Sequence, residues 1–235
     1  HSTNFRHITG DSFAIALKNG VELENINYIQ IHPTTLFQRK PGRRFLISES
    51  VRGEGAKLYD KNMNRFVNEL LPRDLLTQEI RKQMEIDGTE FVWEDLRPIP
   101  EEELKNHFPN IVEHCKKQGY DVTKECIPVV PAQHYYMGGI KVDEYSKTNM
   151  NRLYAVGETA CNGVHGKNRL ASNSLLESLV FAKRAAGNMA KDIHDDEYVE
   201  LPDIDITEYL NEEQLDAEYA EIVRSKLQED NNDVR

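Results

Sequence analysis

Cysteine is scarce in this sequence, and the few cysteines present lie far apart. Cys115, Cys126 and Cys161 form no C-x-x-C pair within the 235 residues. This spacing predicts neither a disulfide framework nor a thiolate zinc site. We therefore expect no metal centre and three thiols that act as ordinary packing residues.

Long apolar runs and an excess of basic charge are also missing. No segment approaches the roughly 20 apolar residues of a membrane span, and the opening HSTNFRHITG lacks the layout of a signal peptide. These absences predict a cytoplasmic protein. The 29 basic residues against 40 acidic ones give a net charge of -11, which argues against nucleic acid or an anionic membrane as a partner. An anionic ligand would need local basic groups.

The hydrophobic fraction of 39% is enough to bury a core in one domain or in two small ones. The alternation in ENINYIQI predicts a strand over residues 24–31 that ends at His32-Pro33. Apolar residues repeat every four positions after Pro72, which predicts a helix over residues 72–86. Two short helices are expected over residues 98–119, with Gly119 as the terminator.

The second half of the chain is expected to alternate short strands with one long helix. Strands are expected at residues 126–130, 139–143 and 152–156. Ser174 and Glu177 have the S-x-x-E spacing of a capping box, which predicts a helix from Ser174 to about His194. Beyond residue 195 the acidic composition suits one amphipathic helix but not a domain.

The segment VGETACNGVHGKNRLASNSLLES carries the richest pattern. A strand ending at Gly157-Glu158, a glycine-rich loop and a helix N-terminus form an arrangement that binds anionic or electron-rich ligands. Glu158 could accept hydrogen bonds from ribityl or ribose hydroxyls, and the N–H groups of Ser174 and Leu175 could face a flavin. The alternative is a plain glycine-rich connection.

Two arginines are candidates for binding a carboxylate. Arg73 lies in the first turn of its helix, where a cation opposes the helix dipole, and a bound carboxylate would offset that cost. The alternative is an Arg73 that pairs with Asp74 or is solvated. Arg169 lies between a strand and a helix, where it can clamp a carboxylate with two hydrogen bonds.

Two histidines and a Ser-Glu pair complete the candidate set. His32 and His134 each border an irregular stretch and could donate a hydrogen bond to a substrate carboxylate, although a lone histidine is more often structural. Ser48 could bind an anion and Glu49 could orient an arginine, or the pair could simply start a helix. The sequence alone does not show that these groups converge.

Several strings then occur in an order that resembles the succinate dehydrogenase, fumarate reductase and L-aspartate oxidase flavoprotein family. They are IHPTTL, FLISESVRGEGAKL, LLPRDLL, PAQHYYMGGIKVD, LYAVGE and HGKNRLASNSLLES. The resemblance covers roughly residues 1–194. LASNSLLE and GGIKVDEYSKT are closer to the L-aspartate oxidase branch, because the respiratory branch more usually carries LGGNSLLD.

This resemblance implies an α+β fold, with a capping domain of the fumarate reductase flavoprotein type and a remnant of a split FAD-binding α/β domain. Residues 1–31 and 135–194 would belong to the FAD domain, and residues 32–134 to the capping domain. Residues 195–235 would form an acidic, partly helical tail.

The resemblance also implies roles for individual residues. His32, His134 and Arg169 would bind substrate carboxylates, and Ser48 and Glu49 would contact or support the second carboxylate. Arg73 would be the acid/base or charge-stabilising group at the reacting carbons. The residues that would touch FAD are Glu158, Asn173, Ser174 and Leu175.

The implied reaction oxidises L-aspartate to iminoaspartate, with a hydride passing to FAD and oxygen or fumarate reoxidising the flavin. Its product would feed quinolinate synthase in NAD biosynthesis. Two alternatives stay open. The chain could belong to a fumarate reductase or succinate dehydrogenase flavoprotein acting on fumarate or succinate, or it could be a non-catalytic dicarboxylate-binding module.

The sequence departs from the family pattern in three respects. No G-x-G-x-x-G dinucleotide fingerprint is present, and most of the family's C-terminal helical domain has no counterpart. We therefore expect a fragment that binds FAD weakly or not at all and is inactive alone. Lys167 stands where the family usually has alanine, and we expect its side chain to point outward rather than to tune the flavin.

Overall fold

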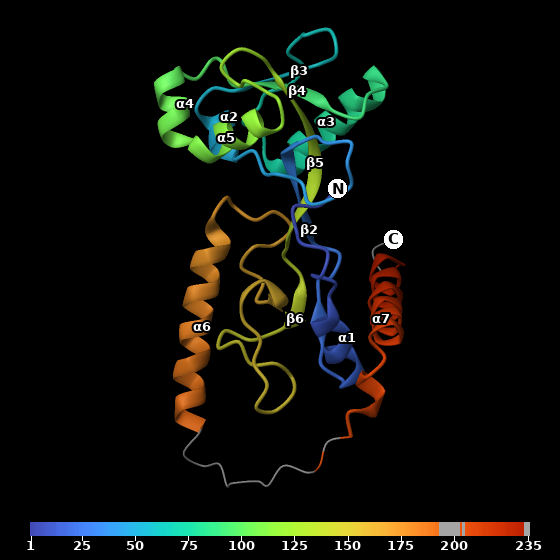
Figure 1. Cartoon of the computed structure of the whole chain (residues 1–235). Coiled ribbons are helices and arrows are strands. Elements are labelled where there is room, and N and C mark those ends of the chain that lie inside the picture. Colours follow the sequence, from blue (N-terminus) through green and yellow to red (C-terminus); the bar gives the residue numbers. More distant parts are fainter. Residues whose placement is uncertain (193–202, 204, 233–235) are drawn as a thin grey trace. The chain divides into compact units, whose positions relative to one another are not determined.

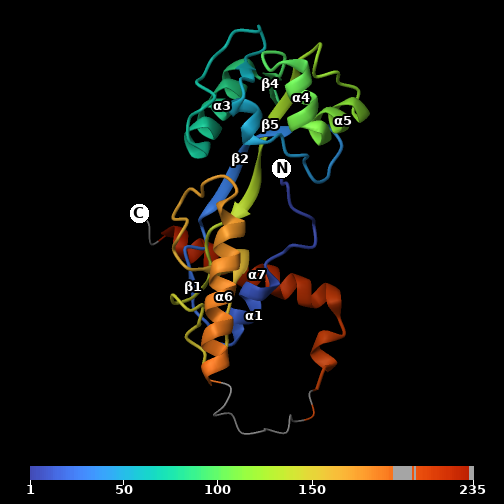
Figure 2. The ribbon, with the colours of Figure 1, turned by 90° about the vertical axis from the view of Figure 1, so that its left-hand side faces the viewer.

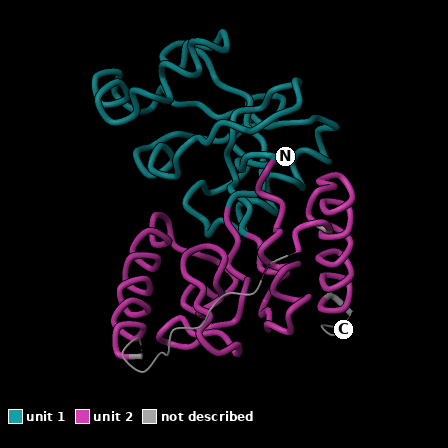
Figure 3. Tube along the Cα trace, turned by 60° about the horizontal axis from the view of Figure 1, so that its bottom comes forward, with its two compact units in different colours: residues 1–6, 30–134 teal, residues 7–29, 135–235 magenta. Residues whose placement is uncertain are grey.

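The computed structural model describes residues 1–192, 203 and 205–232. The chain forms two compact units, coloured separately in Figure 3. Unit 1 contains residues 1–6 and 30–134, and unit 2 contains residues 7–29 and 135–235. The chain therefore passes from one unit to the other three times.

Unit 1 is built on a four-stranded sheet of order β2-β5-β4-β3, with helices α2 to α5 between the strands (Figure 1). Its elements are β2 (Ile29–Leu36), α2 (Glu49–Gly53), β3 (Lys57–Tyr59), α3 (Arg73–Asp87), β4 (Val92–Asp95), α4 (Glu101–His107), α5 (Pro109–Lys117) and β5 (Ile127–Tyr136). Strand β4 runs antiparallel to both β3 and β5. Ile29, Tyr135 and Tyr136 lie at strand ends that belong to unit 2.

The core of unit 1 joins the sheet to its helices. Leu76 and Ile80 of α3 are fully buried with Leu58 of β3 and Ile127 of β5. Burial of one such side chain contributes about 1.5–3 kcal/mol. This core holds rigidly the strands and helix ends that carry the polar residues described below.

Unit 2 places helices around a small three-stranded sheet of order β1-β6-β7. Its elements are α1 (Asp11–Lys18), β1 (Leu23–Glu24), β6 (Gly139–Lys141), the 3-10 helix η1 (Gly157–Thr159), β7 (Ala160–Cys161), α6 (Asn173–Asp192), the 3-10 helix η3 (Thr207–Tyr209) and α7 (Glu212–Asn232). Helix α7 packs against α1, as both ribbon views show (Figures 1 and 2), and Lys18 pairs with Glu218 at 2.7 Å.

Two successive glycines allow the strands of unit 2 to approach closely. A side chain at Gly138 would collide with the carbonyl of Asn25, and one at Gly139 with the carbonyl of Thr159. Gly139 also has a φ of 144°, which L side chains rarely adopt. The GG pair is therefore required by backbone packing.

The helix predictions for the middle of the chain are confirmed. The predicted helix over 72–86 is α3, with Pro72 just before it, and the two short helices are α4 and α5. Gly119 follows α5 with a φ of 94°. The three cysteines are free, and Cys115 and Cys161 are buried. The α+β fold class is also confirmed.

Two strand predictions are wrong. The strand expected over 24–31 is broken at a turn after Glu24, and β2 runs through Pro33 to Leu36. Residues 152–156 form only an isolated bridge, in which Tyr154 faces Lys147. Turn chemistry interrupts both segments, since Asn25 and Arg152 have positive φ values of 54° and 63°.

The predicted capping box at Ser174 and Glu177 is also wrong. Helix α6 begins at Asn173, so Ser174 lies inside its first turn. Ser172, with a φ of 60°, ends the preceding loop. Glu177 instead accepts a hydrogen bond from Asn162. The predicted end near residue 194 lies outside the described residues, and in the described part of the chain no helix is long and apolar enough to cross a membrane.

Candidate active site

Arg73 is the centre of a buried polar cluster in unit 1. Its Nε donates to Glu49 Oε2 at 2.6 Å, and its NH1 donates to Gln30 Oε1 at 2.9 Å. The arginine is 8% exposed and Gln30 is 3% exposed. The alternative of a solvated Arg73 is therefore excluded. Glu49 orients the guanidinium, and this fits the function suggested for it from the sequence.

Ser48 and Glu49 are placed by the start of α2. Ser48 is the N-cap residue, and its hydroxyl accepts a hydrogen bond from the backbone N–H of Ser50 at 3.3 Å. The cap fixes the direction of the helix, which brings Glu49 in the first turn to Arg73. The helix-start interpretation of this pair and the arginine-orienting one are therefore both correct for the geometry. An anion-binding role for Ser48 stays a prediction.

His32 and His134 lie together on neighbouring strands. Their ring centroids are 5.4 Å apart, on β2 and β5 respectively. His32 is 1% exposed, and its Nε2 lies 2.8 Å from the Ile47 carbonyl oxygen, which requires a proton on that nitrogen. Burial, followed by the positive charge of Arg73, holds the pKa of His32 well below its usual value.

The neutral His32 ring leaves Nδ1 as a lone-pair acceptor, with no hydrogen-bond partner among the described residues. Donation from this ring to a substrate carboxylate would require the other tautomer and the loss of the bond to Ile47. His134 is half-buried, and its Nδ1 lies 2.9 Å from the Thr3 hydroxyl. The carboxylate-binding role of both histidines stays a prediction.

Two buried residues of unit 1 that interact electrostatically with this cluster or with each other, Arg52 and Glu94, had no role predicted from the sequence. Arg52 is 3% exposed and donates to the Glu69 carbonyl at 2.8 Å, while its Nε and NH2 have no partner among the described residues. Glu94 is fully buried, and neither of its carboxylate oxygens has a partner there. Complete burial raises the pKa of Glu94 to about 8, although the charge of Arg52 lowers it.

A local signal for Glu94 was present in the sequence. In the string FVWED, strand alternation places Glu94 on the same face as Val92, which is 1% exposed. A carboxylate on the apolar face of a strand is rarely buried without a function or a counter-charge. Arg52, whose positive charge lowers the pKa of Glu94, lies on a different element, α2, and has no such local signal.

The neutral state of His32 predicts an observable difference within unit 1. We expect its ring to stay neutral at pH values where an ordinary histidine becomes protonated, because burial holds the folded pKa well below the usual value. His107 is exposed and pairs with Glu54 at 2.8 Å, which raises its pKa, so it should titrate above the usual midpoint. Histidine NMR spectra against pH, assigned with His32→Gln and His107→Gln, measure both. A His32 midpoint at or above that of His107 would contradict the geometry.

Arg169 lies in unit 2 and packs against an aromatic ring. It is 4% exposed, its guanidinium carbon lies 4.3 Å from the ring centroid of Tyr135, and its NH1 donates to the Leu170 carbonyl at 3.1 Å. His165 and Glu177 were not singled out as site residues, yet they lie together nearby, 3.9 Å apart, and both are largely buried. The structure thus places Arg169 in a buried polar environment in unit 2, while His32, Arg73 and His134 belong to unit 1.

The residues expected to contact FAD all lie in unit 2. Glu158, in η1, accepts a hydrogen bond from the backbone N–H of Tyr136 at 2.9 Å. The side chain keeps solvent contact, but the surrounding protein removes enough water to raise the pKa of Glu158, while the N–H of Tyr136 lowers it. Asn173, Ser174 and Leu175 form the first turn of α6, where backbone N–H groups have no acceptor within the helix.

The start of α6 also presents apolar side chains to solvent. Leu170, Leu175, Leu176 and Leu179 are each more than 60% exposed. Lys167, as expected, points to solvent, with its ammonium 5.1 Å above the ring of Tyr28. No group of His, Cys, Asp or Glu within the described ranges is arranged to hold a metal ion.

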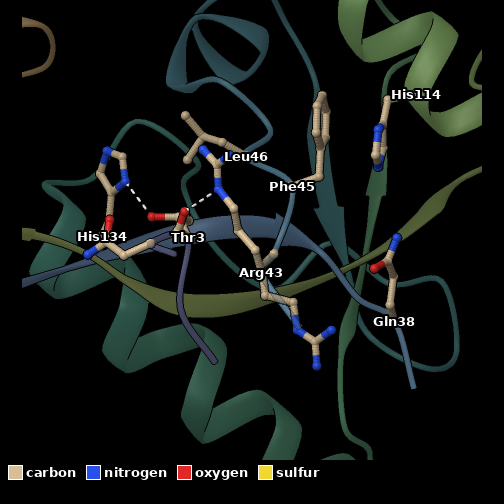
Figure 4. A pocket seen from close by; sticks show the side chains of 9 residues that line it. Thr3, Gln38, Arg43, Phe45, Leu46, His114 and His134 are labelled. Carbon is tan, nitrogen blue, oxygen red and sulfur yellow. Dashed lines mark hydrogen bonds between the residues drawn. The ribbon is translucent and has the colours of Figure 1, made fainter. Parts of the chain in front are cut away.

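A pocket of about 410 Å³ in unit 1 lies beside His134 (Figure 4). Thr3 connects two of its lining side chains, because its hydroxyl contacts His134 and its carbonyl accepts from Arg43 Nε at 2.6 Å. Arg44, His114 and Phe45 also line it, and the last two rings stack at 3.7 Å. The pocket shows that the His134 ring faces an accessible, positively charged hollow.

Comparison with known proteins decides the family. The family described as "FAD binding domain" matches residues 1–175. The chain belongs to this family. Among the curated proteins, the chain is similar to the L-aspartate oxidase of Clostridium perfringens, 56% identical over 186 residues, which are 79% of this chain and 42% of the relative. The L-aspartate oxidase of a Nostoc species is 45% identical over 240 residues, covering 96% of this chain and 41% of the relative.

Solved structures of similar sequence show the same fold. A quinol fumarate reductase variant from E. coli is 32% identical, covers 97% of this chain and 40% of that chain, and superposes with a TM-score of 0.76. The family resemblance seen in the sequence is thereby confirmed. The chain spans about two-fifths of the length of the curated relatives it matches.

The residues of unit 2 fit one end of the family's cofactor. The first turn of α6 offers N–H donors and a positive dipole end, and Glu158 offers acceptors for hydroxyl groups. These donors suit the flavin and ribityl portion of FAD. The sequence contains no G-x-G-x-x-G, so nothing in it matches the element that binds the pyrophosphate of a dinucleotide.

Proposed function

We propose that this chain forms the dicarboxylate-binding part of a flavin-dependent L-aspartate oxidase, which converts L-aspartate to iminoaspartate. The observation that carries the proposal is the buried Arg73, held by Glu49 and Gln30 within the electrostatic reach of His32. A fixed cation of this kind can stabilise charge at a reacting carbon without reorganisation. We take L-aspartate as the proposed substrate from the names of the relatives that are 45–56% identical.

The chain's own residues have separate tasks in this proposal. Arg73 holds or moves a proton at the reacting carbons, and its two hydrogen bonds fix the guanidinium in one orientation. His32, His134, Arg169, Ser48 and Glu49 bind or support the two carboxylates. Bound FAD would accept a hydride from the substrate. Glu158 and the start of α6 would hold the FAD.

Titration calorimetry with succinate and, separately, with FAD tests the binding part of this proposal. Saturable succinate binding by this chain, weakened at least about tenfold by Arg169→Ala, is the expected result, since a charge-assisted bond contributes about 1.5–3 kcal/mol. Arg184→Ala, which removes an exposed guanidinium from α6, is the matched control and should bind as the parent does. No succinate binding by the protein in the form its organism makes would contradict the proposal.

The solved relatives favour one rival, a fumarate reductase flavoprotein, since two of them, 32% and 33% identical, are quinol fumarate reductases. Hydrogen peroxide production that depends on L-aspartate would support the oxidase, and turnover of fumarate without aspartate oxidation would support the reductase. A cytoplasmic location and a link to quinolinate synthase stay predictions of the resemblance.

A further inference from the structure

A second hollow of unit 1, of about 690 Å³, shares none of its lining residues with the Arg73 cluster. Its lining combines four aromatic rings with two cations and contains no acidic residue. The residues that carry the argument are Phe37, Phe91, Trp93, Tyr120, Arg39 and Lys40.

The aromatic side of this hollow is fixed by the sheet. Trp93 of β4 lies directly opposite Pro128 of β5, and the N–H of Phe37 donates to the Pro128 carbonyl at 2.9 Å. The ring centroids of Phe91 lie 5.0 Å from those of both Trp93 and Phe37. Val92 on one side of Trp93 faces the core, so the indole lies on the other face of the sheet. Rigid strands therefore hold a group of rings that remain partly accessible.

The positive charge of the hollow comes from a basic loop in an otherwise acidic chain. The string QRKPGRR, residues 38–44, carries four basic residues in a chain of net charge -11. Arg39 and Lys40 are exposed, and across the described residues no carboxylate oxygen lies within the 4.0 Å of an ion pair from either of them. Two cations without a counter-charge beside solvent-accessible aromatic rings favour a ligand that supplies both a ring and a negative charge.

We infer that this hollow binds a planar aromatic anion, with the ring against Trp93 and Phe91 and a phosphate or carboxylate facing Arg39 and Lys40. Stacking of a ring on an aromatic side chain is favourable and tolerates different ring types. The charged group adds hydrogen bonds to a guanidinium and an ammonium. The inference is independent of the oxidase activity, since it uses neither the Arg73 cluster nor any residue of unit 2.

The hollow contains its own reporter, because Trp93 is the single tryptophan of the sequence. Its fluorescence should be quenched saturably when this chain is titrated with adenosine monophosphate or with benzoate. The first probe carries a phosphate on a purine nucleoside and the second a carboxylate on a single ring, and saturable quenching by either supports the inference. Adenosine and inorganic phosphate, each offering half of the required chemistry, should bind at least about tenfold more weakly than adenosine monophosphate.

Two variants separate the roles of charge and ring. The double variant Arg39→Ala/Lys40→Ala should weaken binding of the stronger probe at least about tenfold, whereas Arg81→Ala/Lys82→Ala, two exposed cations of α3, should leave it unchanged. Phe91→Leu keeps an apolar side chain and should weaken binding through loss of the ring. The inference is overturned if neither anion quenches Trp93 saturably, if adenosine binds as tightly as its phosphate, or if the two double variants behave alike.

Discussion

Arg73→Lys is expected to lower kcat for L-aspartate oxidation by about 10²- to 10⁴-fold, the usual cost of removing a proton-transferring or charge-stabilising group. Lysine keeps the charge, but a single ammonium cannot reproduce the planar fork that bonds Glu49 and Gln30 at the same time. The cation would therefore lose its fixed position at the reacting carbons. Steady-state kinetics on the protein as its organism makes it measure the change.

The division of the loss between kcat and KM identifies the role of Arg73. Loss of a group that acts in the transition state lowers kcat with little change in KM. Loss of a group that only binds substrate raises KM instead. Arg81→Lys, on an exposed position of the same helix, is the control and should change neither constant. If a correctly folded Arg73→Lys protein keeps a kcat within about threefold of the parent value, Arg73 does not act in the chemical step.

The buried carboxyl group of Glu94 is expected to make unit 1 less stable as pH rises. The folded pKa is about 8 against a usual 4.5, so between these values the folded state holds a proton that the unfolded state has released. Stability is therefore greatest below the unfolded pKa and decreases up to the folded pKa, by about 1.4 kcal/mol per pH unit. Between pH 6 and 8 this single group should lower the free energy of unfolding by about 2 kcal/mol, because the slope flattens as the folded pKa is reached.

Glu94→Gln isolates this effect, because an amide of the same shape does not titrate. Urea unfolding at several pH values should show that the variant lacks the decrease seen in the parent, and the difference between the two curves cancels all other titrating groups. Glu85→Gln, an exposed carboxylate of α3, should follow the parent. Parallel curves for parent and Glu94→Gln would show that Glu94 is ionised in the folded protein.

The local residue pattern was sufficient to predict the helices of unit 1 but not to predict which residues form the polar cluster. The four-residue repeat of Leu76 and Ile80 encodes a buried helix face directly, and α3 follows it. Gln30 of β2 and Arg52 of α2 lie close enough to interact with Arg73. Their positions depend on strand pairing and helix docking between segments that are distant in the sequence. No local spacing records such pairing.

Turn chemistry explains most of the local errors. Positive φ values at Asn25, Arg152 and Ser172 end or interrupt segments whose apolar patterns continue through them. The family resemblance identified Arg73, His32 and His134 by their motifs, and the structure brings these three residues into one unit. Arg169 lies in the other unit, so its role still depends on the succinate titration.

The three crossings between the units, at residues 6–7, 29–30 and 134–135, determine how the protein responds to a protease. A single nick at any one crossing leaves two covalent connections intact, so the cut chain still migrates as one particle under native conditions. Only a denaturing gel would reveal the cleavage. No single cut can release either unit, and cloning unit 1 as a separate polypeptide would require joining residues 1–6 to residues 30–134 through a new linker.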